Sequence, residues 1–222
     1  MILNEFDTEK SFFYENGFYV TSQIDRMGKF LAHYELYKRI VDLPGQIIEC
    51  GVFKGNSLQR LATFRELLEN PFSRKIIGFD IFGKFPDTNF KDDKQFLDKF
   101  ISSAGDESIQ IDELEKVFEF KGLKNIELVK GNINNTVPDY VKKHPQLKIA
   151  FLHIDTDVYE PAVTILNTFY KHVVKGGLIV FDDYGTFPGE TKAVDDFFAG
   201  KDVEIKKLPF YQVPSFIVKN EF

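Results

Sequence analysis

The chain is short of several residue types, and each shortage excludes a class of protein. It has one cysteine, Cys50, so an internal disulfide and a zinc site built on several cysteines are both excluded. Only five of its 222 residues are arginine, so fork-type recognition of phosphate groups is not prominent. Acidic residues outnumber basic ones by 34 to 28, and the net charge of −6 disfavours a protein that binds a nucleic-acid backbone.

Long hydrophobic runs are also missing. No apolar run reaches about 18 residues, the length that a membrane-spanning helix needs. The first residues, MILNEFDTEKSFFYENG, carry early acids and lack the basic start and apolar middle of a signal peptide. We therefore expect a cytoplasmic protein that has no membrane partner.

The composition is that of an ordinary globular protein, with 43% hydrophobic and 28% charged residues. The length suits one sizeable α/β domain, and no repeat or low-complexity linker divides the chain. Residues 1–21 are aromatic-rich and irregular, whereas apolar residues at helical spacing predict a helix over 22–43. We expect an N-terminal helical extension over residues 1–45 and a single domain over residues 46–222.

From residue 46 onward, short apolar runs alternate with helical stretches. Strands are predicted at 46–53, 75–82, 126–133, 148–155 and 177–184, and helices at 56–69, 111–121, 137–143, 159–173 and 191–198. A polar insert occupies 83–108, and the C-terminal tail predicts two short strands that pair as a hairpin. This alternation indicates an α/β fold with a mostly parallel, seven-stranded sheet and helices on both faces.

Acidic residues stand at or just beyond the carboxyl ends of four predicted strands. They are Glu49, Asp80, Asp155 with Asp157, and Asp182 with Asp183. One acid at a strand end is usually a helix cap or a solvated loop residue. Because ligands of such sheets bind at the carboxyl ends of the strands, four acidic ends on one sheet indicate a binding site.

The first of these strands leads into a glycine turn, IIECGVFKGNS. Its pattern, Glu49-x-Gly51-x-x-x-Gly55, differs from the G-x-G-x-x-G fingerprint of dinucleotide-binding proteins. A carboxylate just before the turn suits a ligand that carries an ammonium group, and Asp80 can accept hydrogen bonds from ribose hydroxyls. Together they indicate S-adenosylmethionine as the cofactor.

Five motifs, in order, resemble those of the TylF-like class I methyltransferases. They are ECGVFKGNS, GFDIFGKFP, LVKGNINNTVPDYV, HIDTDVYEP and VVKGGLIVFDDYGTFPGETKAVDDF, and they fall within residues 46–198. This family includes the sugar O-methyltransferases of tylosin, mycinamicin and novobiocin biosynthesis. The resemblance implies a Rossmann-like class I methyltransferase fold. It also implies magnesium-dependent methyl transfer from S-adenosylmethionine to a hydroxyl of a deoxysugar or glycosylated small molecule.

The resemblance also implies roles for single residues. Asp157 falls on the position of the general base, and the metal ligands are Asp155, Asp182 and Asp183. The cofactor-binding positions are Glu49, Gly51, Val52, Gly55, Ser57, Asp80 and Gly131. Three carboxylates suit a hard cation such as Mg²⁺ and leave coordination positions for substrate hydroxyls.

Local geometry separates the acids within each pair. In an extended segment Asp155 and Asp157 face the same side, roughly 6.5–7 Å apart, so one can bind metal while the other reaches a hydroxyl. Asp182 and Asp183 are adjacent and would face opposite ways in a strand. Both can bind one cation only if the chain turns, and Gly185 permits such a turn.

Two other functions fit the same predicted fold. A dinucleotide-dependent oxidoreductase is one, although the missing fingerprint counts against it. A non-catalytic module that binds S-adenosylmethionine or a metal is the other.

Three features outside the acidic strand ends stay open. His153 is most simply a packed or hydrogen-bonded strand residue, and Arg26 with Lys29 most simply a solvated helix face, with contact to a phosphate group as the alternative. The aromatic N-terminal segment could fold over the active site or cover a partner subunit. We expect a homo-oligomer.

Overall fold

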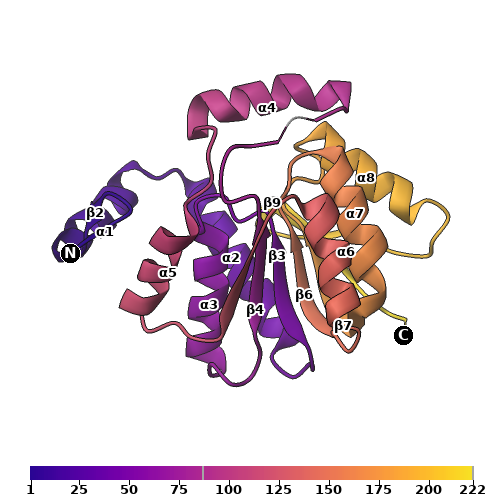
Figure 1. The fold of residues 1–222 in the computed structure, drawn as a ribbon, viewed down its shortest axis with the longest axis horizontal. Helices are drawn as coiled ribbons and strands as arrows, with labels where there is room; N and C mark the ends of the chain where they lie inside the picture. The colour runs from indigo at the N-terminus through magenta and orange to yellow at the C-terminus, as the bar shows by residue number, and fades with distance from the viewer. Residues whose placement is uncertain (87, 222) are drawn as a thin grey trace.

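The computed structural model describes residues 1–86 and 88–221 and contains one seven-stranded sheet (Figure 1). Its strands are β3 (Gln46–Cys50), β4 (Ile76–Asp80), β5 (Ile126–Lys130), β6 (Ile149–Ile154), β7 (Val173–Phe181), β8 (Lys206–Leu208) and β9 (Tyr211–Val218). They lie in the order β5-β4-β3-β6-β7-β9-β8, and only the pairs made by β9 are antiparallel. The mostly parallel, seven-stranded sheet is confirmed. The C-terminal hairpin is confirmed too.

Helices cover both faces of the sheet because alternate strand residues point to opposite sides. One face packs on α2 (Ile24–Tyr37), α3 (Asn56–Leu68) and α5 (Ile111–Phe120), and the other on α6 (Ile133–Lys143), α7 (Tyr159–Phe169) and α8 (Pro188–Phe198). Ile47 and Phe151 belong to the first core, whereas their chain neighbours Ile48 and Leu152 belong to the second. The continuous apolar runs are thus strands buried on both faces.

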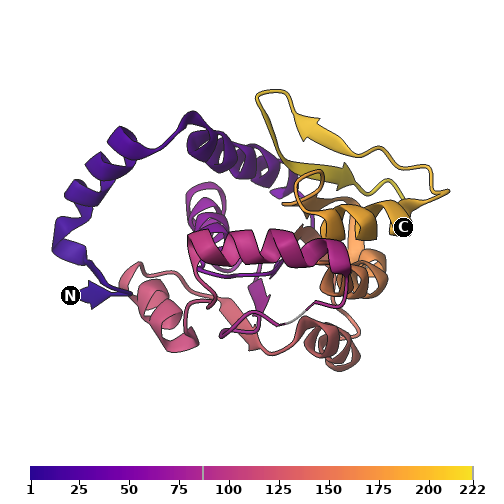
Figure 2. The same ribbon diagram turned by 90° about the horizontal axis from the view of Figure 1, so that it is seen from above.

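The N-terminal segment departs from its prediction. Residues 1–21 were expected to be irregular, but they contain a small hairpin, β1 (Ile2–Leu3) with β2 (Phe6–Asp7), and helix α1 (Ser11–Thr21). That expectation was wrong because apolar residues surround this helix instead of forming one stripe, and no residue of α1 is buried. α1 lies at one end of the molecule, apart from the sheet (Figure 2).

The polar insert also forms a helix, α4 (Lys91–Ala104). Its base is closed by an antiparallel bridge between Lys84 and Glu107, and Ser108 N–H donates to the Gly83 carbonyl at 3.0 Å. α4 therefore lies across the carboxyl edge of the sheet, above the ends of β3 and β6 (Figures 1 and 2).

The strand order determines where along the sheet a ligand site can open. The chain moves outward from β3 in one direction through β4 and β5, and in the other through β6 and β7. Loops that follow β3 and β6 therefore leave the sheet on opposite sides and open a crevice between them, the usual ligand position in such folds.

Candidate active site

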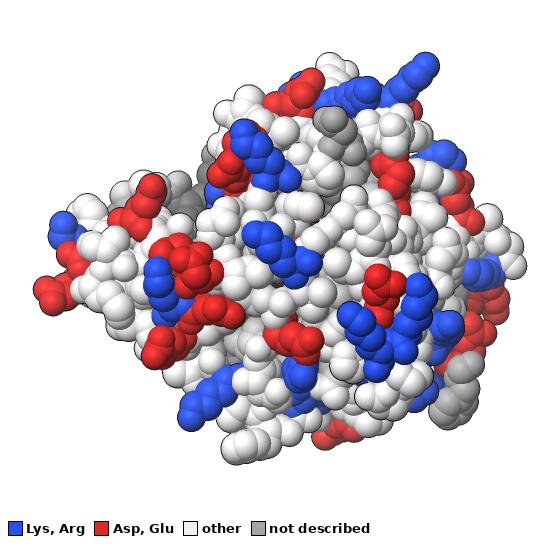
Figure 3. Space-filling model, viewed as in Figure 1, with Lys and Arg blue, Asp and Glu red and all other residues white. Residues whose placement is uncertain are grey.

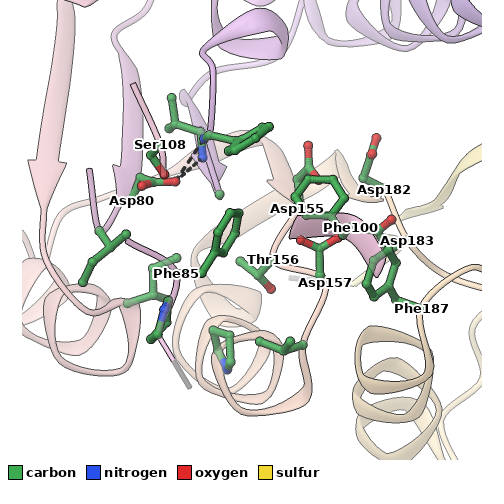
Figure 4. A pocket seen from close by; sticks show the side chains of 18 of the residues that line it. Asp80, Phe85, Phe100, Ser108, Asp155, Thr156, Asp157, Asp182, Asp183 and Phe187 are labelled. Atoms are coloured by element: carbon green, nitrogen blue, oxygen red, sulfur yellow. Dashed lines mark hydrogen bonds between the residues drawn. The ribbon is translucent and has the colours of Figure 1, made fainter. Parts of the chain in front are cut away.

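A cavity of about 640 Å³ opens at the carboxyl ends of the strands, beneath α4. Its lining includes the predicted cofactor residues Gly51, Val52, Ser57, Asp80 and Gly131 and the four aspartates 155, 157, 182 and 183. Figure 4 shows these aspartates on one side and Asp80 on the other. The fold thus gathers nearly all of the predicted site residues around one space.

Glycine is required at the start of the cofactor turn. Gly51 has φ +91°, and a Cβ there would lie 1.7 Å from the backbone oxygen of Asp155. The turn after β3 and the acidic loop after β6 therefore touch backbone to backbone. Only glycine permits this close approach, which brings the two loops to the same cavity.

Two of the predicted cofactor residues support the turn instead of lining the cavity. Glu49 is fully buried, and its Oε1 accepts a hydrogen bond from Ser57 Oγ at 2.6 Å. Gly55, at φ +78°, begins α3 where a Cβ would lie 2.8 Å from a Leu114 methyl carbon. In this structure Glu49 holds Ser57, and Gly55 lets α3 begin beside Leu114; their cofactor roles stay predictions.

Asp80 holds the same turn from the neighbouring strand. Its carboxylate accepts backbone N–H groups from Val52 at 2.8 Å, Phe53 at 3.0 Å and Phe82 at 2.6 Å. A carboxylate has about four lone-pair sites, so capacity is left on the cavity side. The predicted ribose contact of Asp80 is compatible with this arrangement.

The acids that follow β6 and β7 form a tight cluster. Asp155, Asp157 and Asp183 place one carboxylate oxygen each within 4.8 Å of one another. Burial raises the pKa of Asp157 to about 6, and it raises those of Asp155 and Asp183 well above their usual range, with the neighbouring acids adding to the effect. Such a cluster stabilises a positive charge placed between its members.

The residues fit a divalent cation of the magnesium type. All three donors are hard carboxylate oxygens, and Asp183 Oδ2 is buried without a hydrogen-bond partner. Cys50 is buried in the core and does not line the cavity, so no thiol among the lining residues favours a softer metal.

Local backbone geometry brings the cluster together in a way that differs from the extended segment expected. β6 ends at Ile154, and Asp157 has φ +61°, so the chain curls after the strand and turns Asp157 back toward Asp155. After β7, Gly185 at φ +84° allows the expected turn.

The turn after β7 nevertheless separates Asp182 from Asp183. Asp182 forms an ion pair with Lys29 of α2, and its Oδ1 lies 3.4 Å from His153 Nε2 and 3.7 Å from His33 Nε2. Burial opposes its ionisation, but Lys29 and His153 outweigh this and hold the Asp182 pKa well below its usual value. Asp182 thus already has a cationic partner, whereas Asp183 does not.

His153 links this pair to the cofactor turn. Its Nδ1 lies 3.8 Å from Glu49 Oε2, so its two nitrogens face carboxylates at the ends of β3 and β7. Burial disfavours its charge, yet Asp182 and Glu49 raise its pKa to about 10. The neighbouring His33 has its pKa lowered to about 4 by burial. His153 is therefore a buried strand residue hydrogen-bonded to Asp182, as the simpler interpretation predicted.

Two supporting residues were not identified from the sequence. Glu190 of α8 is fully buried; its Oε1 accepts Asp183 N–H at 3.0 Å and its Oε2 accepts Thr156 N–H at 3.4 Å. Lys29 was assigned to a solvated face, which was wrong because its side chain turns inward to Asp182. Glu190 stands within the GETKAV stretch of the last motif, but no local pattern distinguishes it.

An aromatic wall completes the cavity on the α4 side. Phe53, Phe85 and Phe100 contact one another at 5.3–5.7 Å between ring centroids, and Phe187 lies 6.4 Å from Phe100. α4 is held down by Asp93, whose Oδ2 accepts Tyr159 N–H at 2.9 Å. Aromatic faces opposite carboxylates suit a ring that carries both hydroxyls and C–H groups.

The fold and the cavity together define a Rossmann-like class I methyltransferase. A sequence model of the family described as Macrocin-O-methyltransferase (TylF) matches residues 25–212, and the chain belongs to this family. The protein is therefore an enzyme of the methyltransferase class, and family and fold support S-adenosylmethionine as its methyl donor. Membership also decides against the dinucleotide-dependent alternative.

Similar proteins agree with this assignment. The crystal structure of CalS11, a calicheamicin methyltransferase, is 28% identical with a TM-score of 0.76, over 96% of this chain and 85% of that one. The O-methyltransferase NovP is 19% identical with a TM-score of 0.71, over 86% and 79%, which shows a shared fold. The uncharacterized protein R132 of Acanthamoeba polyphaga mimivirus is 29% identical over 165 residues, 60% of this chain and 74% of that protein. Among the described residues, no helix is long and apolar enough to span a membrane.

The Lys29–Asp182 pair gives a stability test. Lys29→Met leaves the Asp182 charge buried without its ammonium partner, and we expect the free energy of unfolding at pH 8 to fall by roughly 3 kcal/mol. Adding Asp182→Asn should recover most of the loss, because the double variant removes the unpaired Asp182 charge, while His153 keeps Glu49 as its other neighbour. Urea unfolding measures both. Lys38→Met, which removes an exposed pair with Glu35, is the matched control and should change little.

Equal losses in Lys29→Met and in the double variant would contradict this account of the pair. The wild type, Lys29→Met, Asp182→Asn and the double variant form a double-mutant cycle. The coupling energy from this cycle measures the interaction between the two side chains.

Proposed function

We propose that this enzyme transfers a methyl group from S-adenosylmethionine to a hydroxyl of a sugar-containing small molecule, with Mg²⁺ bound at the acid cluster. One observation carries the proposal: the glycine turn and the carboxylate cluster line the same cavity and meet where Gly51 contacts the Asp155 backbone. A methyl donor on the turn would therefore lie beside a hydroxyl held at the cluster.

In this mechanism the chain supplies alignment, charge and a base. Asp155 and Asp183 would hold the cation, which when bound lowers the pKa of the acceptor hydroxyl. Asp157 takes the proton of that hydroxyl, and its pKa near 6 suits a base that works around neutral pH. The turn at Gly51 and the aromatic wall exclude water and fix the donor, and such alignment can supply about 7–11 kcal/mol.

The third predicted metal ligand, Asp182, is the least suited of the three. Lys29 already neutralises its carboxylate, and the Asp182 ligand atom groups with those of His33 and His153 instead of with the three aspartates of the cluster. We propose that Asp182 mainly positions the loop, with Asp155 and Asp183 as the principal ligands.

The acceptor is proposed from the cavity and from one relative. The apo structure of CalS11 is described as that of a TDP-rhamnose 3'-O-methyltransferase, and it is 27% identical to this chain. The aromatic wall suits the C–H face of a sugar ring, and the acid cluster suits its hydroxyls. Lys, Arg, Asp and Glu are interspersed over the face in Figure 3, which supports a small-molecule partner over nucleic acid. A cytoplasmic location fits such a substrate.

Asp157→Asn is the direct test of the base. The amide cannot accept the proton, so we expect kcat to fall by about 10²–10⁴-fold while binding of S-adenosylhomocysteine is unchanged. Transfer of labelled methyl to a panel of nucleotide deoxysugars and glycosides, with and without EDTA, measures this. Asp139→Asn, an exposed acid on α6, is the control and should stay fully active.

Activity that survives EDTA would contradict the role of Mg²⁺. Full activity of Asp157→Asn would contradict the role of that residue.

A pH series tests the cation without any acceptor. Because burial raises the pKa values of Asp155, Asp157 and Asp183, these carboxyls hold protons in acid and release them as the pH rises. We expect the increase in Tm caused by Mg²⁺ to be small at pH 5 and to grow through pH 6 toward pH 8. Differential scanning fluorimetry measures it, with Asp183→Asn abolishing the increase and Asp139→Asn preserving it. A shift that is constant across this range would argue against the cluster as the site.

We also propose that α1 packs against a second copy of the chain. An isolated helix of 11 residues is marginal in water, yet α1 has no buried residue and exposes Phe12, Phe13, Tyr19 and Val20 by 63–85%. In a dimer, each copy would cover these apolar side chains of the other copy. The alternative is closure of this segment over the chain's own active site.

Light scattering after gel filtration distinguishes the two arrangements of α1. Phe12→Ser with Phe13→Ser should reduce the mass of an oligomer to the 25.7 kDa of one chain. Phe72→Ser, equally apolar and 93% exposed elsewhere, should leave the mass unchanged. A wild-type protein of 25.7 kDa would overturn the proposal.

A further inference from the structure

Two arginines lie on the helical wall of the cavity without a role in the mechanism above. Arg26 stands in the first turn of α2 and Arg60 in the middle of α3, and both line the cavity that holds the acid cluster. Arg60 follows Ser57 by three residues, so the two share a face of α3 just beyond the cofactor turn.

Neither guanidinium group has an anionic partner among residues 1–86 and 88–221. Arg60 stacks on the Phe30 ring, 6.0 Å from its centroid, and it forms no side-chain hydrogen bond or ion pair there. By contrast, the buried Arg74 bonds to Glu69 and to several backbone carbonyls. Lys29, the third cation of this wall, is already engaged by Asp182.

The position of Arg60 is unfavourable unless something else binds there. Its side chain is only partly exposed, so it has lost much of its contact with water without gaining a partner. Burial lowers the pKa of Arg60, an effect that Asp182 and Glu49 oppose and that the charge of Arg26 reinforces. An oxyanion between the two guanidinium groups would satisfy both, with bidentate hydrogen bonds of the kind arginine forms.

We propose that Arg26 and Arg60 form an anion-binding subsite for a carboxylate or phosphate group of a bound small molecule. This subsite rests on the proposed function for the identity of its ligand. Two sources would present such a group here. One is the methionine carboxylate of the cofactor, because Arg60 follows the cofactor turn. The other is an anionic group on the acceptor, because the same wall lines the cavity that holds the acid cluster.

Calorimetry with two nucleosides separates these sources. S-adenosylhomocysteine carries the carboxylate, whereas 5'-methylthioadenosine lacks the whole amino-acid tail. If the cofactor is the source, Arg60→Gln should weaken binding of S-adenosylhomocysteine by about 10–100-fold, as expected for a charged hydrogen bond, and leave 5'-methylthioadenosine unchanged. Arg26→Gln should act in the same direction. Arg39→Gln, whose guanidinium stacks on Phe216 outside the cavity, is the matched control.

If the acceptor is the source, both nucleosides should bind the variants as tightly as the wild type. The KM for an anionic acceptor, such as a nucleotide sugar, should then rise at least 10-fold, with no change for a neutral glycoside. Equal nucleoside binding and equal KM values for both acceptors in all variants would overturn the subsite.

A probe that needs neither cofactor nor acceptor keeps the subsite testable by itself. Inorganic pyrophosphate should raise the Tm of the wild type and of Arg39→Gln but not that of the Arg26→Gln, Arg60→Gln double variant. Protection by pyrophosphate without any binding of S-adenosylhomocysteine would retain the subsite and overturn the proposed function. Binding of both nucleosides, with no effect of either arginine on that binding, on the KM for the anionic acceptor or on protection by pyrophosphate, would retain the proposed function and overturn the subsite.

Discussion

Repulsion between buried carboxylates is the constraint on which the site depends. Asp157, Asp182, Asp183 and Glu190 are buried at one edge of the sheet, and Asp155 is half-buried beside them. Such groups persist only if a cation or a proton compensates them. Lys29 forms an ion pair with Asp182, whereas it acts on Asp155, Asp157 and Asp183 only through longer-range attraction. An external cation bound among Asp155, Asp157 and Asp183 would compensate their negative charge most simply.

The division between Asp182 and Asp183 follows from the backbone. The last strand residue, Phe181, pairs with β6, and the turn that follows sends consecutive side chains to different neighbours. Asp182 faces α2, which brings Lys29 and His33, whereas Asp183 faces Asp155 and the N–H-accepting Glu190 side chain. Two identical residues thus acquire opposite pKa shifts.

The sequence predicted the sheet, its hairpin and the location of the site, because period, glycine turns and strand-end acids are local signals. It did not predict the partner of Asp182, since the Lys29–Asp182 contact joins residues 153 positions apart. Nor did it predict the curl at Asp157, because a left-handed conformation at a non-glycine residue is imposed by packing. Helix α1 escaped detection because its apolar residues form no single stripe.

The acidic and basic side chains of the cavity come from different parts of the fold, and this separation suits a ligand that carries charges of both signs. Acids come from the strand ends, where the sheet edge concentrates them, while the unpaired arginines come from α2 and α3. S-adenosylmethionine carries a sulfonium, an ammonium and a carboxylate within one short tail. A cavity with acids alone would bind its cations but repel its carboxylate. The proposed subsite on the helical wall would offer that carboxylate, or an anionic group of the acceptor, its countercharge.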